Sequence, residues 1–107
     1  MAALASALAL LLGTLHGQVM RGPIAPICRD GQPCYEPAAG VRLSFSRAGK
    51  TTNVMTDAKG FYRLRLQPGA YTVRTNQRFG TRPQPGRVSV VAGHARRVNF
   101  VIDTGIR

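Results

Sequence analysis

Residues 56–73, with the sequence TDAKGFYRLRLQPGAYTV, decide the fold of this chain. Within Phe61–Leu66 a tyrosine and two leucines alternate with two arginines, which is the period-two pattern of a strand with one buried face. Asp57–Gly60 and Pro68-Gly69 are turn sequences, because Asp can hydrogen-bond its own backbone, Pro presets φ and Gly accepts a positive φ. The alternation resumes at Tyr71. The stretch therefore predicts short strands joined by tight turns.

The same signals recur on both sides of this stretch. Val41–Phe45 alternates apolar and polar residues, Thr51–Thr56 favours a strand through its β-branched residues, and Asn76–Arg87 holds the Pro and Gly residues of an irregular connection. The seven expected strands are His16–Met20, Val41–Phe45, Thr51–Thr56, Phe61–Leu66, Tyr71–Arg74, Val88–Val90 and Val98–Ile102. Seven short strands at regular spacing, with no helix between them, predict an all-β, antiparallel β-sandwich in a single domain.

The chain resembles the carboxypeptidase regulatory-like domains, whose central stretch is matched by Thr56-Asp57-Ala58-x-Gly60-x-Tyr62-x-Leu64-x-Leu66-x-Pro68-Gly69-x-Tyr71-x-Val73. The similarity extends from about His16 to Arg107. It implies a seven-stranded Greek-key sandwich of the prealbumin-like type, with a carbohydrate-binding-like fold, in a bacterial exported protein. Such domains usually serve as accessory modules beside an enzyme or a surface protein. The motif marks a fold well and a function poorly, because each Gly and Pro serves a turn.

The N-terminus is apolar. The first 20 residues carry no charged side chain, and Ala2–Leu12 consists of Ala and Leu with one Ser. Such a run is too short to span a bilayer, which takes about 20 residues, and it suits the apolar region of a signal peptide, roughly 7–15 residues long. The alternative is a short helix packed on the domain. We expect a signal peptide over residues 1–15, a domain over residues 16–107, and a mature protein without a membrane span in the periplasm or the extracellular space.

The two cysteines fit an exported protein. Cys28 and Cys34 lie in the Pro- and Gly-rich stretch Arg21–Gly40, and in an oxidising compartment they are expected to form a disulfide. Closing so short a loop contributes about 2 kcal/mol in the chain-entropy description. A zinc site is not expected, because His16 and His94 give no recognisable ligand spacing with the cysteines. No metal or other cofactor is predicted.

The chain is strongly basic. Its 107 residues include 15 Lys and Arg against four Asp and Glu, a net charge of +11, which makes polyanions the natural partners. If successive strands reverse direction, the connections 21–40, 57–60 and 76–87 share one end of the sandwich with the C-terminal tail, and this end holds all four acids. Eight basic residues lie elsewhere: Arg42, Arg47, Lys50, Arg63, Arg65, Arg74, Arg96 and Arg97. They either form a polyanion-binding surface or simply fill polar outward strand positions, where charge also discourages edge pairing.

The end that holds the acids is also where we expect a specific site, because loops on a rigid scaffold carry much of protein function. The candidate ligand-binding residues are Tyr35, Arg78, Phe79 and Arg82. Their aromatic rings and guanidinium groups suit a sugar or a carboxylate. The alternative is that Tyr35 and Phe79 cap the core while the arginines pair with nearby acids.

No catalytic residues are predicted. The sequence lacks Gly-x-Ser-x-Gly, His-Glu-x-x-His and a glycine-rich phosphate loop. Hydroxyisourate hydrolases share a transthyretin-like sandwich and end in Tyr-Arg-Gly-Ser. This chain ends in Asp103-Thr104-Gly105-Ile106-Arg107 instead, so His16 and His94 are not carried over as catalytic.

The sequence predicts a non-enzymatic, exported β-sandwich that acts as a binding or structural accessory module at the cell envelope. We expect a monomer whose partner is an anionic envelope polysaccharide or a protein. Nucleic acid is not expected, because no recognition helix or aromatic-interleaved basic motif is visible. Two alternatives stay open: a carbohydrate-binding module that uses the loop end, and a small transthyretin-like hydrolase.

Overall fold

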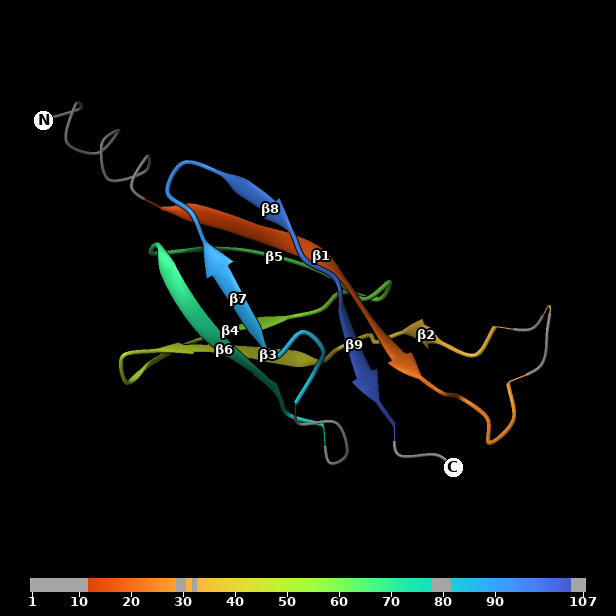
Figure 1. Ribbon diagram of the computed structural model, residues 1–107. Helices are drawn as coiled ribbons and strands as arrows, with labels where there is room; N and C mark the ends of the chain where they lie inside the picture. Colours follow the sequence, from red (N-terminus) through yellow and green to blue (C-terminus); the bar gives the residue numbers. More distant parts are fainter. Residues whose placement is uncertain (1–11, 29–30, 32, 78–81, 105–107) are drawn as a thin grey trace, which may run out of the picture.

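Two β-sheets make up the part of the chain that the computed structural model describes, residues 12–28, 31, 33–77 and 82–104 (Figure 1). The strands are β1 (Gly13–Gly22), β2 (Glu36–Pro37), β3 (Arg42–Arg47), β4 (Lys50–Met55), β5 (Phe61–Leu66), β6 (Gly69–Thr75), β7 (Arg87–Val90), β8 (Ala95–Arg97) and β9 (Phe100–Asp103). The expected all-β sandwich is confirmed. None of the described residues belongs to a helix of the length and apolarity needed to cross a membrane.

The first sheet is built around the long strand β1. Its first half lies between β5, which is antiparallel to it, and β8, which is parallel. Its second half lies between the short antiparallel β2 and the parallel β9. Because every other strand of this sheet pairs with β1, this strand organises one whole layer of the sandwich.

The second sheet has the order β4-β3-β6-β7, and all its pairs are antiparallel. Inward positions alternate with outward ones along β3, β6 and β7, as in β6, where Tyr71, Val73 and Thr75 are buried and the residues between them are exposed. The outward residues include the arginines and hydroxyl side chains of the sequence pattern. The alternation thus sets which side chains are available to a ligand.

The core lies between the sheets. Its largest fully buried side chains are Phe45 and Phe100, from opposite layers, and their ring centroids are 6.1 Å apart. The ring of Tyr62 in β5 lies 5.6 Å from that of Phe100. This aromatic cluster fixes the separation of the two layers near the middle of the sandwich.

The turn before β5 follows the chemistry expected from its sequence. The Asp57 carboxylate accepts backbone hydrogen bonds from Lys59 and Phe61, each over 2.9 Å. Gly60 has a φ of 81°, and a Cβ there would come within 2.6 Å of the Val19 carbonyl. Only glycine meets both conditions without strain.

Nine strands are present in the described residues rather than the expected seven. The added strands are β2, of two residues, and β8, of three residues, neither of which the sequence pattern predicts. The Val98 N–H donates to His16, and the Asn99 side chain accepts from the Gln18 N–H, so the chain leaves regular pairing between β8 and β9. Gly17 permits this close approach, because a Cβ there would overlap the Val98 carbonyl.

Two further features differ from expectation. The sandwich is not purely antiparallel, since β8 and β9 run parallel to β1 after the chain crosses from the other sheet. In addition, β1 begins at Gly13, three residues before the expected start of the domain at residue 16. Leu15 is fully buried. The folded domain therefore includes residues 13–15, which the sequence pattern had placed in the signal segment.

Candidate ligand-binding site

The long connections gather at one end of the sandwich. The last residue of β1, Gly22, is paired with Asp103, the last residue of β9. The connection between β6 and β7 reaches the same end, where Gln84 is bridged to Val101. We use the name loop end for the described residues of 22–41, 56–60, 76–86 and 103–104.

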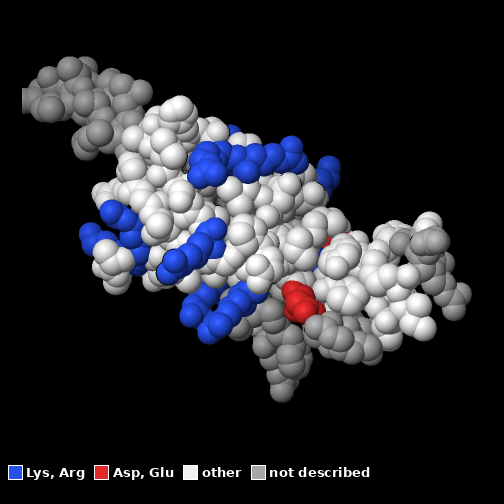
Figure 2. All heavy atoms as spheres, viewed as in Figure 1, with Lys and Arg blue, Asp and Glu red and all other residues white. Residues whose placement is uncertain are grey.

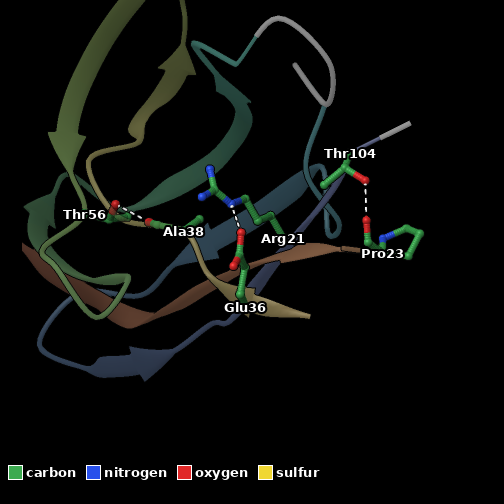
Figure 3. A network of polar contacts seen from close by, with 6 residues as sticks. All are labelled: Arg21, Pro23, Glu36, Ala38, Thr56 and Thr104. Atoms are coloured by element: carbon green, nitrogen blue, oxygen red, sulfur yellow. Dashed lines mark hydrogen bonds and ion pairs between the residues drawn. The ribbon is translucent and has the colours of Figure 1, made fainter. Parts of the chain in front are cut away.

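The first part of the β1–β3 connection is held by two polar contacts (Figure 3). Arg21 donates from Nε to the Glu36 carboxylate over 2.8 Å, which ties β1 to β2 by a charge-assisted bond. The Thr104 hydroxyl donates to the Pro23 carbonyl over 2.6 Å. Together these contacts hold the chain against β9 as it leaves β1.

The last part of the β1–β3 connection, where the chain approaches β3, is held in place by Thr56. Its buried hydroxyl donates to the Ala38 carbonyl over 2.5 Å and accepts from the Val41 N–H over 2.9 Å. One side chain therefore satisfies two backbone groups that would otherwise be buried without partners. The connection is thus fixed at its return as well as at its start (Figure 3).

Cys28 and Cys34 form the disulfide that the sequence predicts. The Ile24 N–H donates to the Cys34 carbonyl over 2.8 Å. Tyr35 follows directly and stands between this fixed cysteine and β2. The disulfide therefore restrains the backbone that carries Tyr35.

A hollow of about 390 Å³ opens beside the Tyr35 ring. We call it the loop-end hollow. It is lined by Gly22, Pro23, Tyr35, Arg82, Gln84, Val101 and Asp103. Gly22 is necessary here, because a Cβ on it would overlap the Tyr35 ring, which is 47% exposed. A half-exposed ring next to an amide, a guanidinium and a carboxylate offers a stacking face together with hydrogen-bond donors and acceptors.

Two of the four predicted site residues are brought together. Tyr35 and Arg82 are 47 positions apart in sequence and line the same hollow. Arg78 and Phe79 lie outside the described residues. The predicted aromatic–guanidinium pairing thus has a geometric counterpart in Tyr35 and Arg82, and Tyr35 is exposed rather than capping the core.

The β6–β7 connection is anchored on both sides. Gln84 and Val101 exchange two backbone hydrogen bonds of 2.9 Å, and the Val73 N–H donates to Gly86 over 2.9 Å. The side chain of Pro83 is almost completely buried. The wall that this segment provides is therefore preorganised, which lowers the entropy cost of binding a ligand against it.

A larger hollow, of about 650 Å³, lies between this anchored segment and β6. We call it the basic groove. Its lining residues are Thr72, Val73, Arg74, Arg82, Pro83, Gln84, Pro85, Gly86 and Arg87. Arg74 and Arg87 come from adjacent strands, and because Arg87 is paired with Thr72, the two arginines are diagonal neighbours on the outer face. Such neighbours are roughly 7–8 Å apart, within reach of a common ligand.

The sequence interpretation missed the basic groove. The sequence places Arg74 among eight basic residues that either form a polyanion-binding surface or fill outward strand positions, and it places Arg87 at the end of the irregular connection 76–87. The available signal was the spacing of Arg82 and Arg87 on either side of Pro83 and Pro85, which suggests a rigid segment with a guanidinium at each end. The register of β6 with β7, which places Arg74 in the same groove, could not be predicted from the sequence spacing.

The charges are unevenly placed. Among the described residues the only ion pair joins Arg21 and Glu36. No acid is among the described residues that line the basic groove. Figure 2 shows blue side chains across the left and centre of the visible face, whereas red atoms appear toward the side of β2 and β9. Arginines without carboxylate partners attract anions from solution.

His16, His94 and Tyr62 lie in strands or turns and are not among the described lining residues of the two hollows. His16 stands in β1 opposite Arg63 and Arg97, and His94 lies in the turn after β7. The Tyr62 hydroxyl donates to Val98 over 2.6 Å, and burial raises the pKa of Tyr62 above its ordinary value. In the described part of the chain no three His, Cys, Asp or Glu side chains are grouped so that they could hold a metal ion.

The sequence of residues 30–103 matches the family described as carboxypeptidase regulatory-like domain. The chain belongs to this family. The resemblance seen in the central motif is therefore confirmed. No curated protein is significantly similar to the chain in sequence.

Solved structures share the architecture of this family member. The Bacillus anthracis TIE protein matches with a TM-score of 0.58 and 19% identity, over 86% of this chain and 16% of its own. A DUF3823 family protein from Parabacteroides merdae gives 0.51 and 19%, over 85% of this chain and 45% of its own. A leucine-rich repeat protein from Bacteroides thetaiotaomicron gives 0.55 and 12%, over 88% and 12%. The chain spans less than half the length of each, and the likeness concerns the fold alone.

Proposed function

We propose that the protein is a non-enzymatic accessory module that is exported and acts at the cell envelope by binding. Membership of the carboxypeptidase regulatory-like family supports an accessory role. The disulfide between Cys28 and Cys34 supports an oxidising compartment. The apolar run of residues 2–12 supports a secretory signal.

The ligand that we propose for this module is a carbohydrate, bound in the loop-end hollow. One observation carries the proposal: the half-exposed Tyr35 ring stands beside Arg82, Gln84 and Asp103 around one concavity. A sugar ring can stack on the aromatic face while its hydroxyl groups donate to the carboxylate and accept from the amide and the guanidinium. The fixed backbone on both sides of Tyr35 keeps this arrangement ready for a ligand.

A glycan array tests both parts of the proposal. The wild-type protein is compared with Tyr35→Ala, Gln84→Ala and the control Phe61→Ala, which removes an aromatic ring of similar exposure that lines neither hollow. We expect saccharide binding that is lost or weakened about tenfold or more in the first two variants and kept in the control. Equal binding by all four proteins would contradict a site at Tyr35. Release of sugar fragments would contradict a non-enzymatic role.

Export is tested by N-terminal sequencing of protein recovered from outside the cytoplasm. Removal of the apolar run is the expected result, since a signal peptide is cleaved during secretion. An intact Met1 would contradict the signal peptide.

A further inference from the structure

One lateral side of the sandwich is open. In the described residues β7 pairs only with β6, and β8 and β9 pair only with β1, so their outer edges face each other across the gap between the layers. The bridge between Gln84 and Val101 crosses this gap. On the opposite side β4 and β5 are joined by the short turn of residues 56–60. The side of β7, β8 and β9 holds the two hollows described above, in which a ligand can lie along the molecule.

Neighbouring hollows on this side have lining residues in common. The loop-end hollow and the basic groove have Arg82 and Gln84 in common. The basic groove shares Pro85 and Arg87 with a third hollow of about 420 Å³, which continues between β7 and β8. The three concavities thus form one elongated track, which we call the edge track, from Tyr35 at the loop end to Arg96 on β8.

The edge track is basic along most of its length. Arg82, Arg74, Arg87 and Arg96 line it, and the only carboxylate among its described lining residues is Asp103, at the loop end. Arg96 is held in place because its Nη1 donates to the Ser89 carbonyl over 2.7 Å. Fixed guanidinium groups bind carboxylate, sulfate or phosphate through paired hydrogen bonds as well as charge.

The lining also argues against a nucleic acid. Single strands are held by aromatic side chains on which successive bases stack. None of the described residues that line the basic groove or the hollow between β7 and β8 is aromatic, and Tyr35, the one aromatic ring among the described lining residues of the edge track, stands at the loop end. The hydroxyl, amide and guanidinium groups that remain suit the polar edges of sugars.

We propose that the edge track binds a linear polysaccharide that carries an anionic group on successive sugars. One sugar stacks on Tyr35, and the anionic groups of the following sugars contact Arg82, then Arg74 and Arg87, then Arg96. This inference rests on the proposed carbohydrate site at Tyr35 and adds the charge and the length of the ligand.

Dextran sulfate and neutral dextran, which share one backbone, test the proposal in calorimetric titrations. The variant Arg74→Ser/Arg87→Ser removes two charges from the basic groove. Its control, Arg63→Ser/Arg65→Ser, removes two exposed charges from β5, outside the edge track. We expect the groove variant to bind dextran sulfate at least about tenfold more weakly than wild type, and the control to stay within about twofold. Equal losses in the two variants would overturn the edge track in favour of a general basic surface.

Chain length and position provide the second measurement. Affinity for sulfated oligosaccharides should rise from a trisaccharide to a decasaccharide, and ¹⁵N spectra titrated with the longer one should show shifts at Gln84 and Val101 but not on β5. Affinity independent of length, or shifts spread over the surface, would overturn the proposal. Tighter binding of a single-stranded oligonucleotide than of the sulfated decasaccharide would also overturn it.

The outcomes separate this inference from the proposed function. If Tyr35→Ala abolishes binding on the glycan array while the groove variant and its β5 control bind dextran sulfate equally, the carbohydrate site stands and the edge track fails. If the groove variant loses dextran sulfate but Tyr35→Ala changes no saccharide binding, the loop-end site fails. The arginine substitutions are at exposed positions, and thermal unfolding of each variant checks that it is folded.

Discussion

Thr56 shows what one buried hydroxyl does in this sandwich. It satisfies the Ala38 carbonyl and the Val41 N–H, one bond as donor and one as acceptor. Thr56→Val keeps the shape and leaves both backbone groups buried without a partner, so the free energy of unfolding should fall by about 1–3 kcal/mol. Urea denaturation measures this fall. Thr52→Val, at an exposed position of β4, is the control and should change it by less than about 0.5 kcal/mol.

Tyr62 predicts a pH dependence. Burial disfavours the phenolate, so the pKa of Tyr62 is raised above the ordinary value of about 10. Between the ordinary value and the raised one, the unfolded chain loses this proton while the folded chain keeps it. The contribution of Tyr62 to stability is therefore complete below pH 10 and is lost progressively as the pH rises above about 10.

Urea unfolding at pH 8 and at pH 11 tests this dependence. We expect Tyr62→Phe to cost about 1 kcal/mol at pH 8, because the bond to the Val98 carbonyl is lost, and to lose less further stability than wild type between the two values. Identical losses in wild type and Tyr62→Phe over this interval would contradict the assignment of the pH dependence to Tyr62.

At the scale of elements, β1 determines the architecture, because all other strands of its sheet pair with it. Gly13, Thr14 and Leu15 are paired with Leu66, Arg65 and Leu64 of β5. A chain that starts at His16 loses these pairs and a fully buried leucine, so we expect it to be less stable than a chain that starts at Gly13 by about 3 kcal/mol or more.

Urea unfolding of the two truncated chains measures this difference, and the chain that starts at Leu12 serves as the reference. Equal stability of the chains that start at Gly13 and His16 would show that the first residues of β1 do not contribute to the core. For the same reason we expect signal cleavage before Gly13 rather than after Leu15.

The sequence predicts best those strands in which apolar and polar residues alternate and which follow a turn with recognisable turn residues. The Asp57–Gly60 turn and β5 are in this group, because side-chain acceptors and glycine backbone freedom act locally. β8 was not predictable from the local pattern, because its three residues are all exposed and it pairs with β1, which is far away in sequence. The start of β1 was obscured because Gly13–Leu15 directly follow the apolar run of residues 2–12.

The residues of the candidate site also divide into those that the sequence could indicate and those that depend on contacts between distant segments. Tyr35 and Arg82 were selected from the sequence because they lie in long loops at one end of the scaffold and offer an aromatic ring and a guanidinium group. Arg74 and Arg87 could not be distinguished from the other strand arginines, since their proximity depends on the pairing of Thr72 with Arg87. Gln84 becomes part of the site only through its bridge to Val101.

At the scale of the whole molecule, the net charge of +11 has two possible consequences for polyanions. A general basic surface would attract any polyanion, and the attraction would fall steeply with salt because exposed charges are screened. The edge track instead concentrates four arginines on one side, next to neutral hydrogen-bonding groups and Tyr35. These two arrangements predict different salt dependence.

We therefore expect dextran sulfate affinity, measured from low to high NaCl, to fall with salt and to retain a residual Tyr35-dependent part at high salt. The variant Arg74→Ser/Arg87→Ser should show a shallower salt dependence than wild type, because two ion contacts are absent from its complex. The control Arg63→Ser/Arg65→Ser should run parallel to wild type, since its lost charges act only through the screened long-range field. Parallel curves for wild type and the groove variant would mean that Arg74 and Arg87 make no direct ion contacts in the complex.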